Sequence, residues 1–149
     1  MDPIENYFDR FRPIPRQRKD DWRQLGRFNA LARREKWSRH ERTEEWENLQ
    51  QAWTEVVEPE FEGSSIRHYQ QLCDDLEIDP IPETVAECKN ELKAVFVNIV
   101  DLVQYRRSGR KGPKSKRFAK LKLLQKYSFD EKKYYPKERA KAEMLKVLL

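Results

Sequence analysis

A chain of 149 residues is long enough to bury one core, and equal shares of hydrophobic and charged side chains, 38% each, predict a densely ionic surface around it. No apolar stretch approaches the length of a membrane-spanning helix, and the opening Met-Asp-Pro-Ile-Glu lacks the pattern of a signal peptide. With two cysteines and no sign of secretion, we expect free thiols in the nucleus or the cytoplasm.

Charge is sorted along the chain. The formal net charge is +5 over residues 1–40, −12 over residues 41–91 and +12 over residues 92–149. Such segregation creates a field that acts on partners and on association rates, and it says nothing about a reaction.

The first segment, residues 1–17, combines aromatic residues and prolines that follow no helical period. We predict an extended arm here. The arm either lies in a groove between helices or docks on a partner, because exposed apolar clusters mark interaction sites. In the second case the partner-binding side chains are Tyr7, Phe8 and Phe11.

The first helix is predicted over residues 19–36. Trp22, Leu25, Phe28 and Ala32 recur there at steps of three and four residues, which is the period of an amphipathic helix.

A second helix is predicted to begin after Ser38, because Glu41 follows it at the spacing of a capping box. Its apolar stripe extends to Val57. Pro59 and Gly63 then end it.

The next two helices are marked by their caps. Ser64 or Ser65 can cap the third helix, which ends before an Asp-Pro-Ile-Pro stretch, and Thr84 begins the fourth. Cys73 and Cys88 fall on the apolar faces of these helices, where a thiol is buried and unreactive.

The β-branched run over residues 95–100 is ambiguous between a buried strand and a helix. We favour a break near Val97 with Asn98 capping a new helix, because a lone strand would have nothing to pair with. Phe118 to Tyr127 marks another helix, and Pro136 opens the last one.

Together these elements predict an all-α fold. We expect a compact bundle of six or seven short helices, with residues 1–17 as an extended aromatic arm and residues 18–149 as a single helical domain. A basic loop lies near residues 106–117 of that domain.

No catalytic site can be assembled from the sequence. His40, His68, Cys73 and Cys88 lack the close paired spacing of zinc modules, and the four glycines form no phosphate-binding loop. Gly109 to Gly112 has the spacing of the loop by which KH modules grip nucleic acid, but the sheet of such modules has no source here. We therefore expect that the protein is not an enzyme and that it binds neither a cofactor nor a metal.

The strongest functional signal is a basic segment. Between Leu102 and Phe129 there is no acidic residue, and ten lysines and arginines accumulate. They could bind nucleic-acid phosphates or an acidic partner, form a bipartite nuclear import signal, or serve only as a solvated surface. The candidate binding residues are Arg106, Arg107, Arg110, Lys111, Lys114, Lys116, Arg117 and Lys120.

The acidic middle argues against a simple DNA-binding module, because it repels phosphate over a screening length of about 8 Å. The same polarity suits an adaptor whose acidic helices and basic arm dock on partners of opposite charge. It also suits head-to-tail association between copies of the chain.

Scattered aromatic residues and one Val-Asn-Ile-Val-Asp-Leu run give the chain a family likeness. It resembles a small helical domain of hypothetical proteins from filamentous fungi. That resemblance implies a compact helical protein and carries over no site residue. The residues that carry it are Trp22, Phe28 to Ala32, Trp37, Leu72-Cys73, Cys88-Lys89, Val97 to Leu102, Tyr135-Pro136 and Ala140-Lys141.

The sequence therefore favours a non-enzymatic adaptor that engages a protein partner through charge-segregated helical surfaces, in the nucleus. The alternative is sequence-independent nucleic-acid binding through residues 106–126. We expect no membrane partner, and homo-oligomerisation is left open.

Overall fold

The computed structural model of the protein describes residues 2–12, 24–112, 114–131, 133, 135 and 137–149. Its elements are α1 (Pro3–Phe8), α2 (Gln24–Glu35), α3 (Arg39–Val57), the 3₁₀ turn η1 (Glu58–Phe61), α4 (Ile66–Asp75), α5 (Val85–Lys93), β1 (Phe96–Val97), α6 (Ile99–Arg107), β2 (Arg117–Phe118), α7 (Leu121–Glu131), the 3₁₀ turn η2 (Lys137–Arg139) and α8 (Glu143–Leu148). The predicted all-α class is confirmed.

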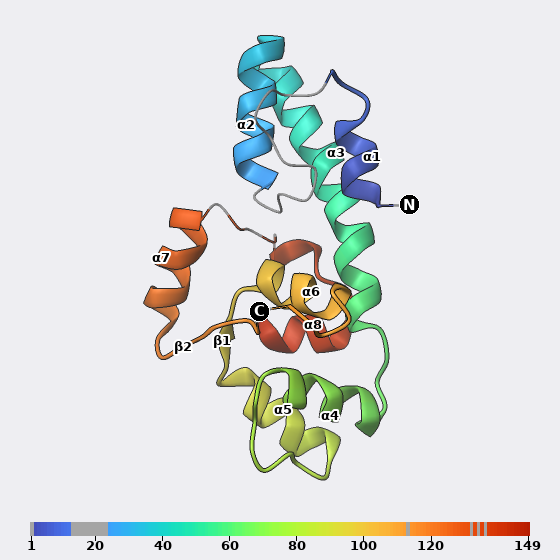
Figure 1. The fold of residues 1–149 in the computed structure, drawn as a ribbon, viewed down its shortest axis with the longest axis vertical. Helices are drawn as coiled ribbons and strands as arrows, with labels where there is room; N and C mark the ends of the chain where they lie inside the picture. Colours follow the sequence, from blue (N-terminus) through green and yellow to red (C-terminus); the bar gives the residue numbers. More distant parts are fainter. Residues whose placement is uncertain (1, 13–23, 113, 132, 134, 136) are drawn as a thin grey trace.

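The longest helix, α3, connects two groups of helices (Figure 1). α1 and α2 lie along one end of α3. α4, α5, α6 and α8 gather near its other end, and α7 stands to one side. Within the described ranges, no helix combines the length and the hydropathy that a membrane crossing requires.

Local capping explains where the helices begin. The Ser38 hydroxyl accepts the N–H of Glu41 at 3.1 Å, and the Glu41 carboxylate accepts the N–H of Ser38 at 3.2 Å, so the predicted capping box is present. Ser65, Thr84 and Asn98 cap α4, α5 and α6 through their side-chain oxygens. The choice between Ser64 and Ser65 is therefore decided in favour of Ser65.

The N-terminal arm is not extended where the structure describes it. Residues Pro3–Phe8 form α1, because the Asp2 carboxylate accepts the N–H of Ile4 at 2.9 Å and Pro3 occupies the first helical position. A helix of six residues, fewer than two turns, is too short to produce a readable period, which is why the sequence pattern missed it. Residues 13–17 of the predicted arm lie outside the described residues.

The region around Val97 also differs from the prediction. β1 pairs with β2 in an antiparallel bridge, with Phe96 opposite Phe118 and Val97 opposite Arg117. The break before Asn98 is confirmed, but the argument that a strand would have no partner is wrong. The partner comes from the basic segment, about twenty residues further along the chain, which no local pattern indicates.

The C-terminal helices begin later than predicted. Phe118 belongs to β2, so α7 begins only at Leu121. The last helix begins at Glu143, after the turn η2, and Pro136 lies outside the described residues.

One hydrophobic core extends from α1 to α8. Met144 and Leu145 of α8 are fully buried in it. The thiols of Cys73 and Cys88 are buried as predicted, and burial together with the neighbouring Cys88 raises the pKa of Cys73 to about 12.

Candidate partner-binding surface

The first predicted binding residue, Arg106, is built into the interior. Its Nε donates to the Asp75 carboxylate at 2.8 Å, and its Nη1 donates to the carbonyl oxygen of Glu60. The guanidinium carbon lies 5.2 Å from the centre of the Phe61 ring, and the side chain is only 6% exposed. Arg106 can meet a phosphate only by leaving this buried position and giving up its hydrogen bonds to Asp75 and Glu60.

Arg110 binds the same carboxylate from the loop that follows α6. Its Nε lies 2.7 Å from Asp75 Oδ1 and its Nη2 lies 3.2 Å from Oδ2. Burial acts to raise the pKa of Asp75, but hydrogen bonds from Arg110 and Arg106 outweigh burial and lower the pKa below its ordinary value. Asp75 ends α4, where two cations also complement the negative end of the helix dipole.

Three further basic side chains fasten the segment to the rest of the molecule. Lys114 lies 2.9 Å from the Glu77 carboxylate, and Arg117 donates to the Leu76 carbonyl oxygen at 3.2 Å. Arg107 contacts the Asp2 carboxylate at 3.4 Å. The two charge blocks of the sequence thus neutralise each other along the C-terminal end of α4.

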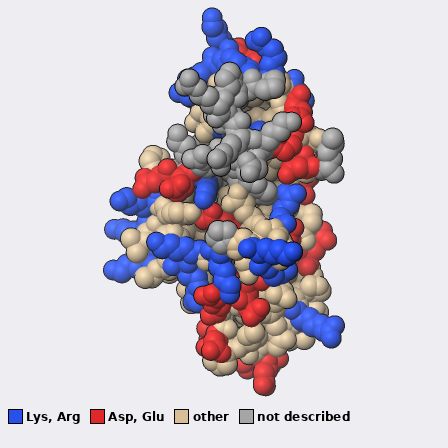
Figure 2. Space-filling model, in the orientation of Figure 1, with Lys and Arg blue, Asp and Glu red and all other residues tan. Residues whose placement is uncertain are grey.

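The other basic side chains remain on the surface. Figure 2 shows lysine and arginine side chains gathered around α7 and across the middle of this face, while acidic side chains dominate the end formed by α4 and α5. Within the basic segment, the exposed lysines that form no ion pair with another described residue are Lys111, Lys116, Lys120, Lys122 and Lys126.

Two of these lysines, Lys122 and Lys126, lie on α7, a helix that has no fully buried side chain. Polar contacts hold its inner face. The Tyr127 hydroxyl donates to the Asp101 carboxylate at 2.6 Å, and Lys133 Nζ binds the same carboxylate at 2.8 Å. Asn98 Nδ2 donates to the Ser128 hydroxyl at 3.0 Å, and the Tyr127 ring lies 5.0 Å from that of Phe118.

The outer side of α7 is apolar as well as basic. Leu121 and Leu123 are each 50% exposed, and Phe129 is 70% exposed. Lys122 and Lys126 are four residues apart and share a helix face with Phe129. We call these five residues the α7 surface. Single exposed apolar residues are ordinary, whereas this short helix carries three of them.

Sequence reasoning missed the apolar part of this surface. Leu121, Leu123 and Leu124 form a cluster that no single face of a helix can bury, and that is the signal that was available.

The aromatic residues of the N-terminal arm support the core and leave no free docking surface. Tyr7 and Phe8 are buried, and the Tyr7 hydroxyl donates to the Glu45 carboxylate at 3.0 Å. Phe11 packs on Trp37 with 5.6 Å between ring centres. The arm packs against other helices at these residues, as one of the two alternatives expected, but it does so through helix α1 and not as an extended segment in a groove.

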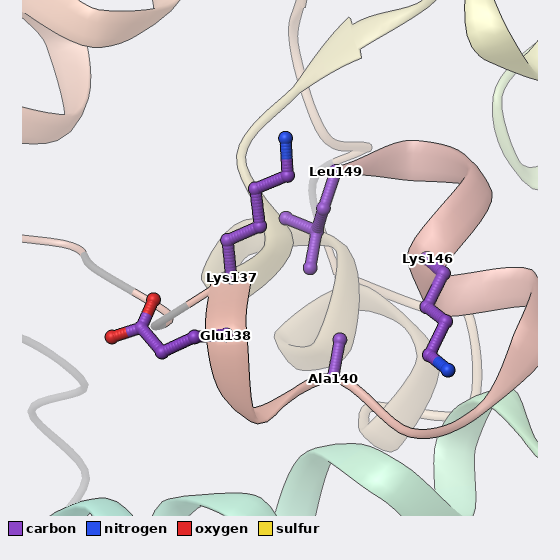
Figure 3. A pocket seen from close by; sticks show the side chains of 5 residues that line it. All are labelled: Lys137, Glu138, Ala140, Lys146 and Leu149. Carbon is purple, nitrogen blue, oxygen red and sulfur yellow. The ribbon is translucent and has the colours of Figure 1, made fainter.

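Two hollows lined by described residues bring together no set of catalytic groups. One hollow has a volume of about 430 Å³, and Ala140 and Leu149 are among the residues that line it. Figure 3 shows Lys137 and Lys146 pointing to different sides of it and Glu138 pointing away. Across the described part of the chain, no three His, Cys, Asp or Glu side chains form a group that could hold a metal ion.

A second hollow, of about 650 Å³, lies between η1 and the start of α8. Its Glu58 carboxylate already accepts the N–H groups of Lys141 and Ala142, each at 2.8 Å. That carboxylate therefore fastens the C-terminal segment to the end of α3.

Comparison of the chain with protein-family models, with curated proteins and with solved structures gives no match. The resemblance to helical domains of filamentous fungi stays a prediction, and the functional argument depends on the surface described above.

Proposed function

We propose that this protein is a non-enzymatic adaptor whose α7 surface binds an acidic, partly apolar segment of a protein partner. The observation that carries the proposal is the combination of exposed Leu121, Leu123 and Phe129 with Lys122 and Lys126 on one helix. Burying a leucine or phenylalanine side chain contributes about 1.5–3 kcal/mol, and the lysines attract and orient an acidic partner.

Nucleic-acid binding is the weaker candidate for two reasons. Arg106, Arg107, Arg110 and Lys114, half of the residues predicted to bind phosphate, contact carboxylates of the same chain. A phosphate backbone would also leave the exposed leucines of α7 without a partner, because phosphate contacts are polar and sequence-independent.

The nuclear location stays a prediction. An import signal that used Arg106 would require its release from Asp75.

The test is fluorescence anisotropy of the full chain with a labelled synthetic peptide in which Glu and Asp alternate with Leu and Phe. We expect salt-sensitive binding that K122E/K126E weakens at least about tenfold, because like charges then face each other. F129A should weaken binding with little change in its salt dependence, because an apolar contact is lost.

The matched control is K93E/K146E, which makes the same change in net charge on α5 and α8, where both lysines are exposed. It should bind the peptide like the wild type. Equal weakening by both double variants would refute a specific site on α7.

A DNA duplex tests the alternative function, nucleic-acid binding. A labelled DNA duplex that binds more tightly than the peptide, with a log–log salt slope of about −3 to −5, would indicate phosphate contacts. If that binding is lost when Lys111, Lys116 and Lys120 become neutral while F129A has no effect, the adaptor proposal is wrong.

A further inference from the structure

We propose that a second copy of this chain supplies the partner segment: the α7 surface of one copy binds the acidic loop over residues 77–83 of another. This inference rests on the proposed function, because it names the partner of the same surface. We call residues 77–83 the acidic loop.

The acidic loop has the chemistry that the α7 surface requires. It connects α4 to α5 and presents Glu77, Asp79 and Glu83 around Ile81, which is 39% exposed. No lysine or arginine occurs between residues 68 and 88. Glu77 is already paired with Lys114, so Asp79 and Glu83 are the carboxylates available to a second copy.

The two surfaces account for all the exposed large hydrophobic side chains of the described residues. Three of them, Leu121, Leu123 and Phe129, lie on basic α7, and the fourth, Ile81, lies in the acidic loop. Opposite charge around complementary apolar groups provides both attraction and a fixed orientation.

The acidic loop is held in one conformation. Ile78 is buried, the Pro82 carbonyl oxygen accepts a hydrogen bond from Gln70 at 3.0 Å, and the Leu76 carbonyl oxygen accepts one from Arg117. A segment that is ordered before binding loses little conformational entropy when it binds.

A single copy does not bring the two surfaces together. α7 is held beside β1 and β2 by Asp101 and Asn98, whereas the acidic loop lies at the far end formed by α4 and α5 (Figure 1). A contact between different surfaces of identical copies is heterologous, so each bound pair retains a free α7 surface and a free acidic loop. Such contacts close into rings or extend into chains. Small charged surfaces make this association weak and sensitive to salt.

The experiment is sedimentation velocity of the full chain from micromolar to submillimolar concentration, at low and at physiological salt. We expect the wild type to associate with rising concentration, and more strongly at low salt. K122E/K126E makes the α7 surface acidic and D79K/E83K makes the acidic loop basic. Each variant alone should associate at least about tenfold more weakly than the wild type, because its two surfaces then carry like charges.

The decisive measurement is made on a mixture of the two variants. In an equimolar mixture, each altered surface meets a surface of opposite charge on the other variant, so association should return. The controls are K93E/K146E and E47K/E55K, which make the same charge changes on exposed positions elsewhere. Circular dichroism of every variant checks that the helices are formed.

Three outcomes would overturn the inference: a wild type that stays monomeric throughout, association that both control variants weaken equally, or folded variants whose mixture does not associate. The first of these leaves the proposed function intact if the synthetic acidic peptide still binds α7. Loss of both self-association and peptide binding refutes both proposals.

Discussion

At the scale of single residues, Asp75 determines where two arginines of the basic segment bind. One buried carboxylate pairs with Arg106 and Arg110, which lie 31 and 35 residues further along the chain. Because a buried charge is stable only when it is paired, this carboxylate holds the loop after α6 in place. Two of the eight arginines and lysines that the sequence offered as binding residues thereby become part of the fold.

Asp75→Asn should lower the free energy of unfolding by about 3–5 kcal/mol, because Arg106 is left buried without its countercharge. Asp74→Asn is the matched control, since Asp74 is exposed, and it should change stability by less than about 0.5 kcal/mol. Urea unfolding of the three proteins at neutral pH measures both effects. Equal stability of wild type and Asp75→Asn would contradict the role of Asp75.

Acid should remove this stabilisation. The pKa of Asp75 is lower in the folded protein than its ordinary value of 3.8. Its contribution is therefore complete above the pKa of the unfolded chain and is lost as the pH falls through the folded-state pKa. The difference in stability between the wild type and Asp75→Asn should be constant from neutral pH to about pH 4 and should shrink below it.

At the scale of elements, the helices differ in what holds them. α3 has a complete capping box and a buried stripe, whereas α7 is held by the polar contacts of Tyr127 and Ser128 without one fully buried side chain. α7 is therefore the helix whose outer side is available for a partner.

Ser38→Ala should cost about 1 kcal/mol, because the N–H of Glu41 then loses its acceptor at the first turn of α3. Ser64→Ala is the control, since Ser65 caps the next helix and Ser64 is exposed. Thermal unfolding followed by circular dichroism compares the two variants. A larger loss for Ser64→Ala would mean that the cap assignment at α4 is wrong.

At the scale of the whole molecule, α3 and one continuous core connect the two groups of helices. Tyr7 and Phe8 contribute to this core at one end of the chain, and Met144 and Leu145 contribute at the other. Contacts of this kind between distant segments favour unfolding in a single cooperative step.

Unfolding by urea should therefore show one transition. Tryptophan fluorescence follows the packing at both ends of α3, because Trp37 and Trp46 pack on Phe28 of α2 and Trp53 packs on Tyr135, and circular dichroism follows all helices. We expect the two midpoints to coincide. Separate midpoints would show that the two groups of helices unfold independently.

The sequence by itself determined the fold class, the charge blocks and the starts of four helices. Ser38, Ser65, Thr84 and Asn98 act on N–H groups within three residues, so local pattern is sufficient to find them. Which residues of the basic segment are bound within the fold depended on tertiary structure. The contacts with Asp75 and with β1 join positions about 20 to 35 residues apart.

The α7 surface was decided in the same way. The leucine cluster signals that part of this helix stays exposed, but only the fold shows that other helices fill the core: Leu102, Val103, Met144 and Leu145 of α6 and α8 are buried, whereas no side chain of α7 is. Local hydrogen bonds can be predicted from neighbouring residues. The burial of a side chain depends on which distant segments pack in the interior of the folded protein.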